Sequence, residues 1–74
     1  MKITYDPEAD ALYIALRDVP AADAIDIEDG VSVDLDKDGH LIGIEILDAR
    51  QRLTPEELTN VSYENLLLAA SAAP

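Results

Sequence analysis

Residues 31–46 read Val31-Ser-Val-Asp34-Leu-Asp36-Lys-Asp38-Gly39-His-Leu-Ile-Gly43-Ile-Glu45-Ile46, and apolar residues alternate with polar ones on both sides of Asp38-Gly39. Period-two alternation with β-branched residues on one side is typical of half-buried strands. Asp38-Gly39 suits a two-residue hairpin turn, because both residue types accept the positive φ that this turn requires. The resulting register pairs Leu35 with Ile42, Val33 with Ile44 and Val31 with Ile46. The stretch therefore predicts a hairpin with one apolar face.

The segment from Asp34 to Glu45 also has the letter pattern of a calcium loop, with acidic residues at positions 1, 3 and 5, glycine at 6 and glutamate at 12. A calcium loop needs flanking helices that bring its ligands to one point, whereas both flanks here have period two. The hairpin register places Asp34 opposite Gly43 and Glu45 opposite Ser32, so the carboxylates spread along a strand face. We therefore expect no metal site or cofactor. The alternative is weak divalent-cation binding by Asp34, Asp36, Asp38 and Glu45.

Three further alternating stretches precede this hairpin, at residues 2–6, 11–17 and 25–28. Asp6-Pro7 begins a turn, and the register that follows pairs Tyr5 with Leu12 and Ile3 with Ile14. Residues 18–24, which include Pro20, form a looser connection.

A third hairpin is predicted around Glu28-Asp29-Gly30, which suits a three-residue turn with Gly30 in the left-handed region. This turn pairs Ile27 with Val31 and Ile25 with Val33. All three hairpins agree on one apolar face, and such agreement is strong evidence for a fold. The sequence therefore predicts an antiparallel sheet, a meander of about five short strands, over residues 1–48.

Residues 53–58, Leu-Thr-Pro-Glu-Glu-Leu, have the pattern of a helix start. Thr54 suits the N-cap, Pro55 the first helical position and Glu57 the capping box. We expect a C-terminal helical segment over residues 54–72 that packs on the sheet, either continuous or broken near Asn60. Residues 1–74 then form a single α+β domain.

The composition bounds the class of protein and its partners. The chain has 74 residues, no cysteine and one histidine, and its 16 acidic residues against five basic ones give a net charge of −11. Small domains without disulfides or a metal often oligomerise, so we expect a homo-oligomer, with a dimer favoured. The negative charge disfavours nucleic acid and anionic membranes and favours a basic protein partner. With no signal-peptide pattern and no apolar run that could span a bilayer, we expect a cytoplasmic protein.

The interface candidates come from two places in the sequence. Tyr13 is predicted on the face opposite Leu12 and Ile14, where Leu41 and Leu47 complete a second apolar patch. In the C-terminal segment, three consecutive leucines point in different directions around a helix, which favours burial against the sheet and another subunit. The candidates are Tyr13, Leu41, Leu47, Leu66, Leu67 and Leu68.

Carboxylates also cluster in the first turn, at Asp6, Glu8 and Asp10. Paired carboxylates carry acid–base chemistry when a cleft desolvates them, but turn carboxylates usually cap backbone amides. No nucleophile–base pair accompanies them, and His40 is expected to be an exposed residue beside the hairpin turn. We therefore predict no catalytic residues, and a small hydrolase is an alternative interpretation.

Two segments resemble the signature of a known family: Ile3-Thr-Tyr5-Asp6-Pro-Glu8-Ala9-Asp10-Ala-Leu12-Tyr13-Ile14 and Gly39-His-Leu-Ile-Gly43-Ile-Glu45-Ile-Leu-Asp48-Ala49. The family consists of small prokaryotic proteins and is known only as a domain of unknown function, number twenty-two eighty-three. The resemblance covers about residues 1–50 and implies a small β-rich domain with a C-terminal helix, without an established activity, cofactor or catalytic residue. Members of that family can lie beside toxin-like proteins, which implies an antitoxin or accessory role. Together with the composition, this favours a non-enzymatic protein-interaction module.

Overall fold

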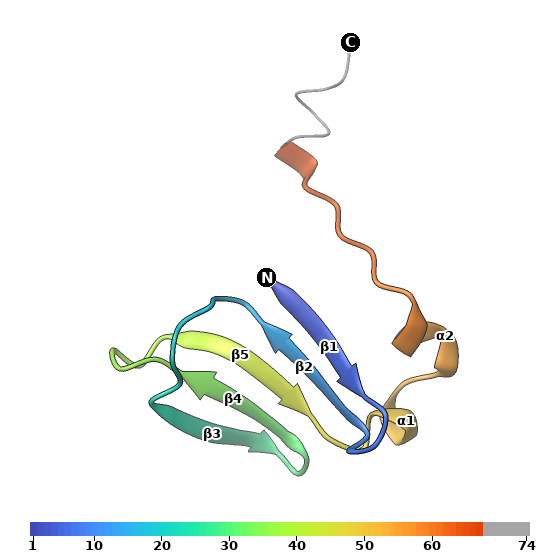
Figure 1. The fold of residues 1–74 in the computed structure, drawn as a ribbon, viewed down its shortest axis with the longest axis horizontal. Coiled ribbons are helices and arrows are strands. Elements are labelled where there is room, and N and C mark those ends of the chain that lie inside the picture. Colours follow the sequence, from blue (N-terminus) through green and yellow to red (C-terminus); the bar gives the residue numbers. More distant parts are fainter. Residues whose placement is uncertain (68–74) are drawn as a thin grey trace.

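The computed structural model describes residues 1–67 of the chain. This part contains a five-stranded antiparallel sheet followed by two short helices, so the predicted α+β class is confirmed (Figure 1). The strands are β1 (Lys2–Asp6), β2 (Ala11–Ala15), β3 (Asp23–Glu28), β4 (Val31–Leu35) and β5 (Leu41–Ile46). The helices are α1 (Ala49–Arg52) and α2 (Pro55–Thr59).

The strand order in the sheet is β1-β2-β5-β4-β3, which differs from the predicted meander. The connection after β2 passes the ends of β5 and β4 to reach the far edge, so that β5 returns beside β2 (Figure 1). Three backbone hydrogen bonds fix this connection. Leu16 N and Arg17 N donate to Ile42 O at 2.8 and 3.3 Å, and Ala22 N donates to Leu35 O at 2.8 Å. Turn chemistry determines each hairpin, but it carries no information on which hairpin edges then pair.

Most of the predicted register is confirmed. In the first hairpin Ile3 lies opposite Ile14 and Tyr5 opposite Leu12. The predicted pairs Ile25–Val33, Val33–Ile44 and Val31–Ile46 are also present.

The pairing of Leu35 with Ile42 was a wrong prediction, because the turn between β4 and β5 is one residue longer than Asp38-Gly39. Asp36 N donates to His40 O at 2.8 Å, which leaves residues 37–39 as a three-residue turn with Gly39 at φ 81°. The Asp36 carboxylate stabilises this turn by accepting hydrogen bonds from the N–H groups of Asp38 and His40, both at 2.9 Å. This turn places Leu35 opposite Leu41. A register shift between Asp34 and Leu35 then restores the predicted pairing of Asp34 with Gly43.

The pairing of Ile27 with Val31 was also wrong. Glu28 lies opposite Val31, and a bulge between Asp26 and Glu28 leaves Ile27 without a directly opposed residue. Gly30 has the expected left-handed conformation, with φ 83°. The turn is therefore shorter than predicted, and the bulge restores the predicted register from Ile25 onward.

The two faces of the sheet have different chemistry. One row of directly opposed residues crosses all five strands on the first face and consists of Ile3, Ile14, Ile44, Val33 and Ile25. We call this the apolar face. The matching row on the opposite face, which we call the polar face, consists of Thr4, Tyr13, Glu45, Ser32 and Asp26. Among the residues that the structure describes, three are fully buried: Ile42 and Ala49, which are 3% and 0% exposed, and Gly43.

The helices lie beyond the end of the sheet where β1 and β5 finish, rather than over a face (Figure 1). The predicted start of α2 is confirmed, since Thr54 Oγ1 accepts from Glu57 N at 3.2 Å and the Glu57 carboxylate accepts from Thr54 N at 2.8 Å. The helix ends at Thr59, and residues 60–65 have no regular secondary structure. Of the two predicted forms, the helical segment is therefore the one broken at Asn60. Residues 68–72 of the predicted segment lie outside the described residues. Four-residue α1 was not predicted, because so short a helix shows no apolar period.

Candidate functional site

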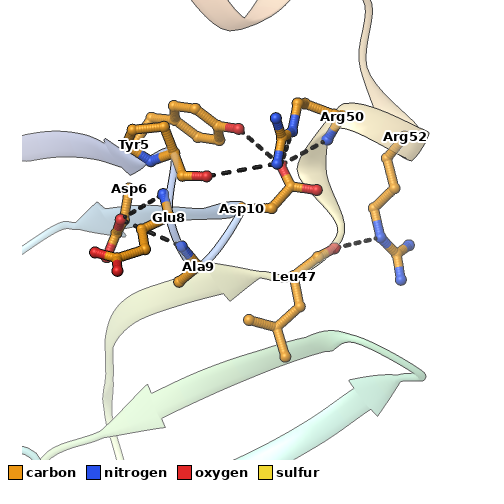
Figure 2. A network of polar contacts seen from close by, with 9 residues as sticks. Tyr5, Asp6, Glu8, Ala9, Asp10, Leu47, Arg50 and Arg52 are labelled. Atoms are coloured by element: carbon orange, nitrogen blue, oxygen red, sulfur yellow. Dashed lines mark hydrogen bonds and ion pairs between the residues drawn. The ribbon is translucent and has the colours of Figure 1, made fainter.

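A polar network joins the first turn of the chain to α1, and Asp10 is its centre (Figure 2). Asp10 Oδ1 accepts hydrogen bonds from Tyr5 Oη at 2.7 Å and from Arg50 N at 3.0 Å, and it lies 3.2 Å from Arg50 Nε. The Asp10 carbonyl accepts from Ala49 N at 3.1 Å. Asp10 has a positive φ of 53°, which costs energy for a residue other than glycine and is offset here by these contacts.

The electrostatics of this network oppose acid–base catalysis. The hydrogen bond from Tyr5, assisted by hydrogen bonds and charge from Arg50, lowers the pKa of Asp10. The same hydrogen bond raises the pKa of Tyr5. A general acid or base works best with a pKa near the working pH, and both groups are shifted away from neutrality. The network therefore favours a structural role for Asp10.

The other two carboxylates of the first turn do not join this network. Asp6 Oδ1 accepts from Glu8 N at 2.9 Å and from Ala9 N at 3.3 Å, so it caps its own turn as expected (Figure 2). Glu8 is exposed. The three acidic residues proposed for the hydrolase alternative are thus not gathered in one site, since Asp6 and Asp10 have different partners and Glu8 is exposed.

A second polar contact crosses the polar face from β2 to β4. Tyr13 Oη donates to Asp34 Oδ2 at 2.7 Å, and this hydrogen bond raises the pKa of Tyr13. The phenol ring passes over Gly43 in β5, where a Cβ atom would clash with Tyr13 Oη and lie 2.6 Å from Tyr13 Cζ. Sequence reasoning missed this contact, although a glycine inside a strand signals the close approach of another group.

The four carboxylates of the calcium-loop pattern are not brought to one point. Asp34 is engaged by Tyr13, while Asp36 accepts two backbone hydrogen bonds from its own turn and lies 3.6 Å from Arg17 Nη1. The hydrogen bond from His40 N is the largest cause of the lowered pKa of Asp36. The His40 side chain is 75% exposed, as predicted. Within residues 1–67, no group of three or more His, Asp or Glu side chains could hold a metal ion.

The comparison with protein families decides where the chain belongs. The sequence model of the family described as "Protein of unknown function (DUF2283)" matches residues 2–50. The chain belongs to the DUF2283 family. This confirms the resemblance, while comparisons with curated proteins and with solved structures found no match. The matched DUF2283 region runs from β1 to Arg50, so it includes the whole sheet and both ends of the Asp10–Arg50 contact.

The predicted interface residues are separated in this DUF2283 protein. Tyr13 lies on the polar face, and Leu47 borders a hollow with the polar-face residue Glu45. Leu41 lies opposite Leu35, because the register shift moves it to the apolar face. The predicted second apolar patch therefore does not form. In the C-terminal segment Leu66 and Leu67 are 70% and 75% exposed, and Leu68 lies outside the described residues. No helix of residues 1–67 has the length and apolar character needed to cross a membrane.

The most extensive candidate surface is the apolar face itself, which sequence reasoning treated as the buried side of the sheet. Ile3 and Ile25, at the two ends of its central row, are 38% and 48% exposed, and the three residues between them are half-buried. Period-two alternation shows that a strand has an apolar side, but it does not show what covers that side. In the described part of the DUF2283 chain, no second layer lies over this face (Figure 1).

Proposed function

We propose that the protein is a non-enzymatic protein-interaction module that works as a homo-oligomer and binds a basic partner through its polar face. The observation that carries this proposal is the separation of chemistry between the two faces of one sheet. Extended faces whose hollows are open to solvent suit the recognition of a protein rather than the conversion of a small substrate. An antitoxin-like or accessory role is consistent with this function.

The arrangement of carboxylates supports a binding role over an enzymatic one. Asp10 and Asp34 accept hydrogen bonds from tyrosines, and Asp6 and Asp36 accept hydrogen bonds from backbone amides of their own turns. Each of these groups stabilises local structure. A hydrolase of this chain would need other groups for its chemistry.

The charge of the chain supports a basic partner. Asp26 and Glu45 belong to the central row of the polar face, and the net charge of −11 extends the negative potential around them. Such a potential accelerates association with a positively charged protein and makes the complex sensitive to salt. The partner expected on this face is therefore a protein with a surface rich in lysine or arginine.

Co-purification tests this proposal. We expect the tagged full chain to retain a basic protein at low salt and to lose it as salt rises, and the product of a neighbouring gene is the first candidate. The variant with Asp26→Asn and Glu45→Gln should bind that partner about tenfold more weakly, because it loses two charges at the contact. The matched control, Glu56→Gln with Glu64→Gln, removes two charges outside the sheet and should bind nearly as well as the natural chain.

Two results would contradict the proposal. One is the retention of no basic protein at low salt, together with a neighbouring gene product that is harmless when it is expressed alone. The other is equal weakening by the polar-face variant and its control, which would show that only overall charge matters.

A further inference from the structure

The apolar face is large for a chain of this size. Besides its central row, it includes a second row of opposed residues from the inner strands, Leu12, Ile46 and Val31. The C-terminal segment extends the apolar surface past the edge of β1, because Val61 and Tyr63 border an open hollow with Met1 and Ile3. These two residues are 65% and 76% exposed.

The charges around this face lie at its margin. The central row contains no ionisable side chain. Acidic residues stand at the two ends of the edge strand β3, and Asp10 accepts a hydrogen bond from Tyr5 of the other edge strand, β1. Asp23 lies opposite Leu35 at one end, and Glu28 lies opposite Val31 at the other, 3.8 Å from Arg52. An apolar centre with a charged margin is the usual composition of a protein–protein interface.

The area of the face fits a contact between two proteins. Five strands about 4.8 Å apart, with five to six residues each at about 3.3 Å per residue, give a flat footprint of about 400 Å². The accessible area is larger, because side chains stand out from the sheet. Two flat footprints total about 800 Å², so the contact needs the additional area of the side chains to approach the roughly 1,200 Å² at which specific interfaces begin. A patch of this size lies within the range of about 300–600 Å² for the largest apolar patch on a typical monomer, and such patches are often functional.

The position of Ile44 makes the face complementary to itself. Ile44 lies in β5, the middle strand of the order β1-β2-β5-β4-β3, and it is the central member of the five-residue row. A two-fold axis that passes near Ile44 in the plane of contact therefore brings the row of one copy onto the row of another. Closed two-fold contacts of this kind are the commonest in homo-oligomers.

Repulsion between two copies is smallest when their apolar faces meet. A chain with a net charge of −11 repels its own copies, so a stable contact must keep the carboxylates apart. When two sheets pack about 10 Å apart through their apolar faces, Asp26 and Glu45 of each copy lie on the outer surfaces. The separation across the dimer then exceeds the screening length of about 8–10 Å at physiological salt.

We infer that the apolar face is a homodimer interface, in which the two sheets pack face to face around Ile44. This deepens the proposed function, because it names the surface of self-association and leaves the polar faces outward for the basic partner. The two copies together then supply the second layer that the described part of the chain lacks.

The mass of the full chain in solution, measured by sedimentation over a range of concentrations, tests the inference. We expect twice the chain mass of 8.0 kDa for the natural protein. Ile3→Asp should raise the dimer dissociation constant at least tenfold, because it places a charge inside the contact. Thr4→Asp is the matched control, on the same edge strand and the opposite face, and should leave the dimer intact. Ile3 is already partly exposed, so circular dichroism should show a folded Ile3→Asp monomer.

Cross-linking gives a second readout that does not depend on a destabilising charge. The chain has no cysteine, so a single cysteine reports one position. Ile44→Cys should give a covalent dimer with a short bismaleimide reagent, because the two-fold axis brings both sulfurs close together. Glu45→Cys, one residue away on the opposite face, should give no covalent dimer.

Several results would overturn the inference: a mass of one chain at all concentrations, equal dissociation by Ile3→Asp and Thr4→Asp, or cross-linking through Glu45→Cys. A monomer that covers the apolar face with an unrelated protein would also overturn it. The inference and the proposed function fail separately. A dimer without a basic partner removes the binding function and leaves the dimer. A monomer that still binds a basic protein through Glu45 removes self-association and leaves the binding function.

Discussion

The two faces of the sheet are built on the same strands but are stabilised in different ways. The apolar face consists of interchangeable aliphatic groups in a row, and its only fully buried strand residue is Ile42 within the described chain. The polar face contains a directed contact from Tyr13 to Asp34 that depends on the missing side chain of Gly43. The apolar face can therefore gain stability from any well-fitting cover, whereas the polar face depends on particular atoms.

This difference has a consequence for evolution and function. Aliphatic groups of similar volume exchange with little loss, so the apolar face tolerates substitution. A directed hydrogen bond over a glycine has no equivalent replacement. The polar face is therefore defined residue by residue, and the apolar face only by its overall character.

The largest effect on stability is expected at Ile42, which is only 3% exposed. Ile42→Ala should lower the free energy of unfolding by about 2–4 kcal/mol, because it removes buried aliphatic groups and leaves a cavity. Leu41→Ala is the matched control, since Leu41 is 41% exposed and its loss should cost less than about 1 kcal/mol. Urea unfolding at one fixed protein concentration measures both. Equal losses would show that burial in the isolated sheet does not distinguish these residues.

The polar face is expected to respond to the gain of a single methyl group. Gly43→Ala should cost about 1–3 kcal/mol, because the new Cβ displaces the Tyr13 ring and breaks its hydrogen bond to Asp34. Tyr13→Ala should remove the obstacle, so Gly43→Ala should cost much less in that background. A double-mutant cycle measured by thermal unfolding gives this coupling. An additive result would mean that the ring moves aside freely.

Most of the strand register was predictable because it depends on local alternation of apolar residues, whereas the lengths of two of the three turns were not. Asp6-Pro7 and the left-handed Gly30 gave pairs such as Ile3–Ile14 and Ile25–Val33, which the structure confirms. The bulge at Ile27 was missed, because one extra residue in a strand does not disturb the pattern of letters around it.

What depends on distant parts of the chain was not predictable from one sequence. The pairing of β2 with β5 and the contacts of Arg50 with Asp10 join segments that no local pattern relates. The candidate surface was named correctly as apolar, yet it was assumed to be covered. Period-two alternation shows which side of a strand is apolar, but it does not show which element or molecule packs on that side.

The Asp10 network joins the first turn to α1 at the end of the sheet. A variant of Asp10 tests whether its hydrogen bonds stabilise this end. The pKa of Asp10 is lowered in the folded state. The stability that this carboxylate contributes is therefore present above the ordinary carboxyl pKa of about 3.9 and is lost as the pH falls through the folded value. Asp10→Asn should therefore weaken the decline of the melting temperature below pH 4. Glu8→Gln, in the same turn but outside the network, should leave that decline unchanged. Thermal melts from pH 7 to pH 2.5 compare the variants, and identical acid limbs for Asp10→Asn and the natural chain would exclude this role.

The smallest effect is expected from calcium. A titration tests whether the carboxylates of the β4–β5 hairpin can gather around an ion. Binding at Asp34 or Asp36 would compete with the hydrogen bond from Tyr13 or with the two backbone hydrogen bonds of the turn. We expect amide NMR shifts that grow slowly up to millimolar calcium without saturation and that magnesium reproduces, because only diffuse attraction to negative charge remains. Saturable shifts at micromolar calcium, shared by Asp34, Asp36, Asp38 and Glu45, would show that the turn rearranges to gather its carboxylates. The hairpin would then carry a site that its hydrogen-bonded form does not contain.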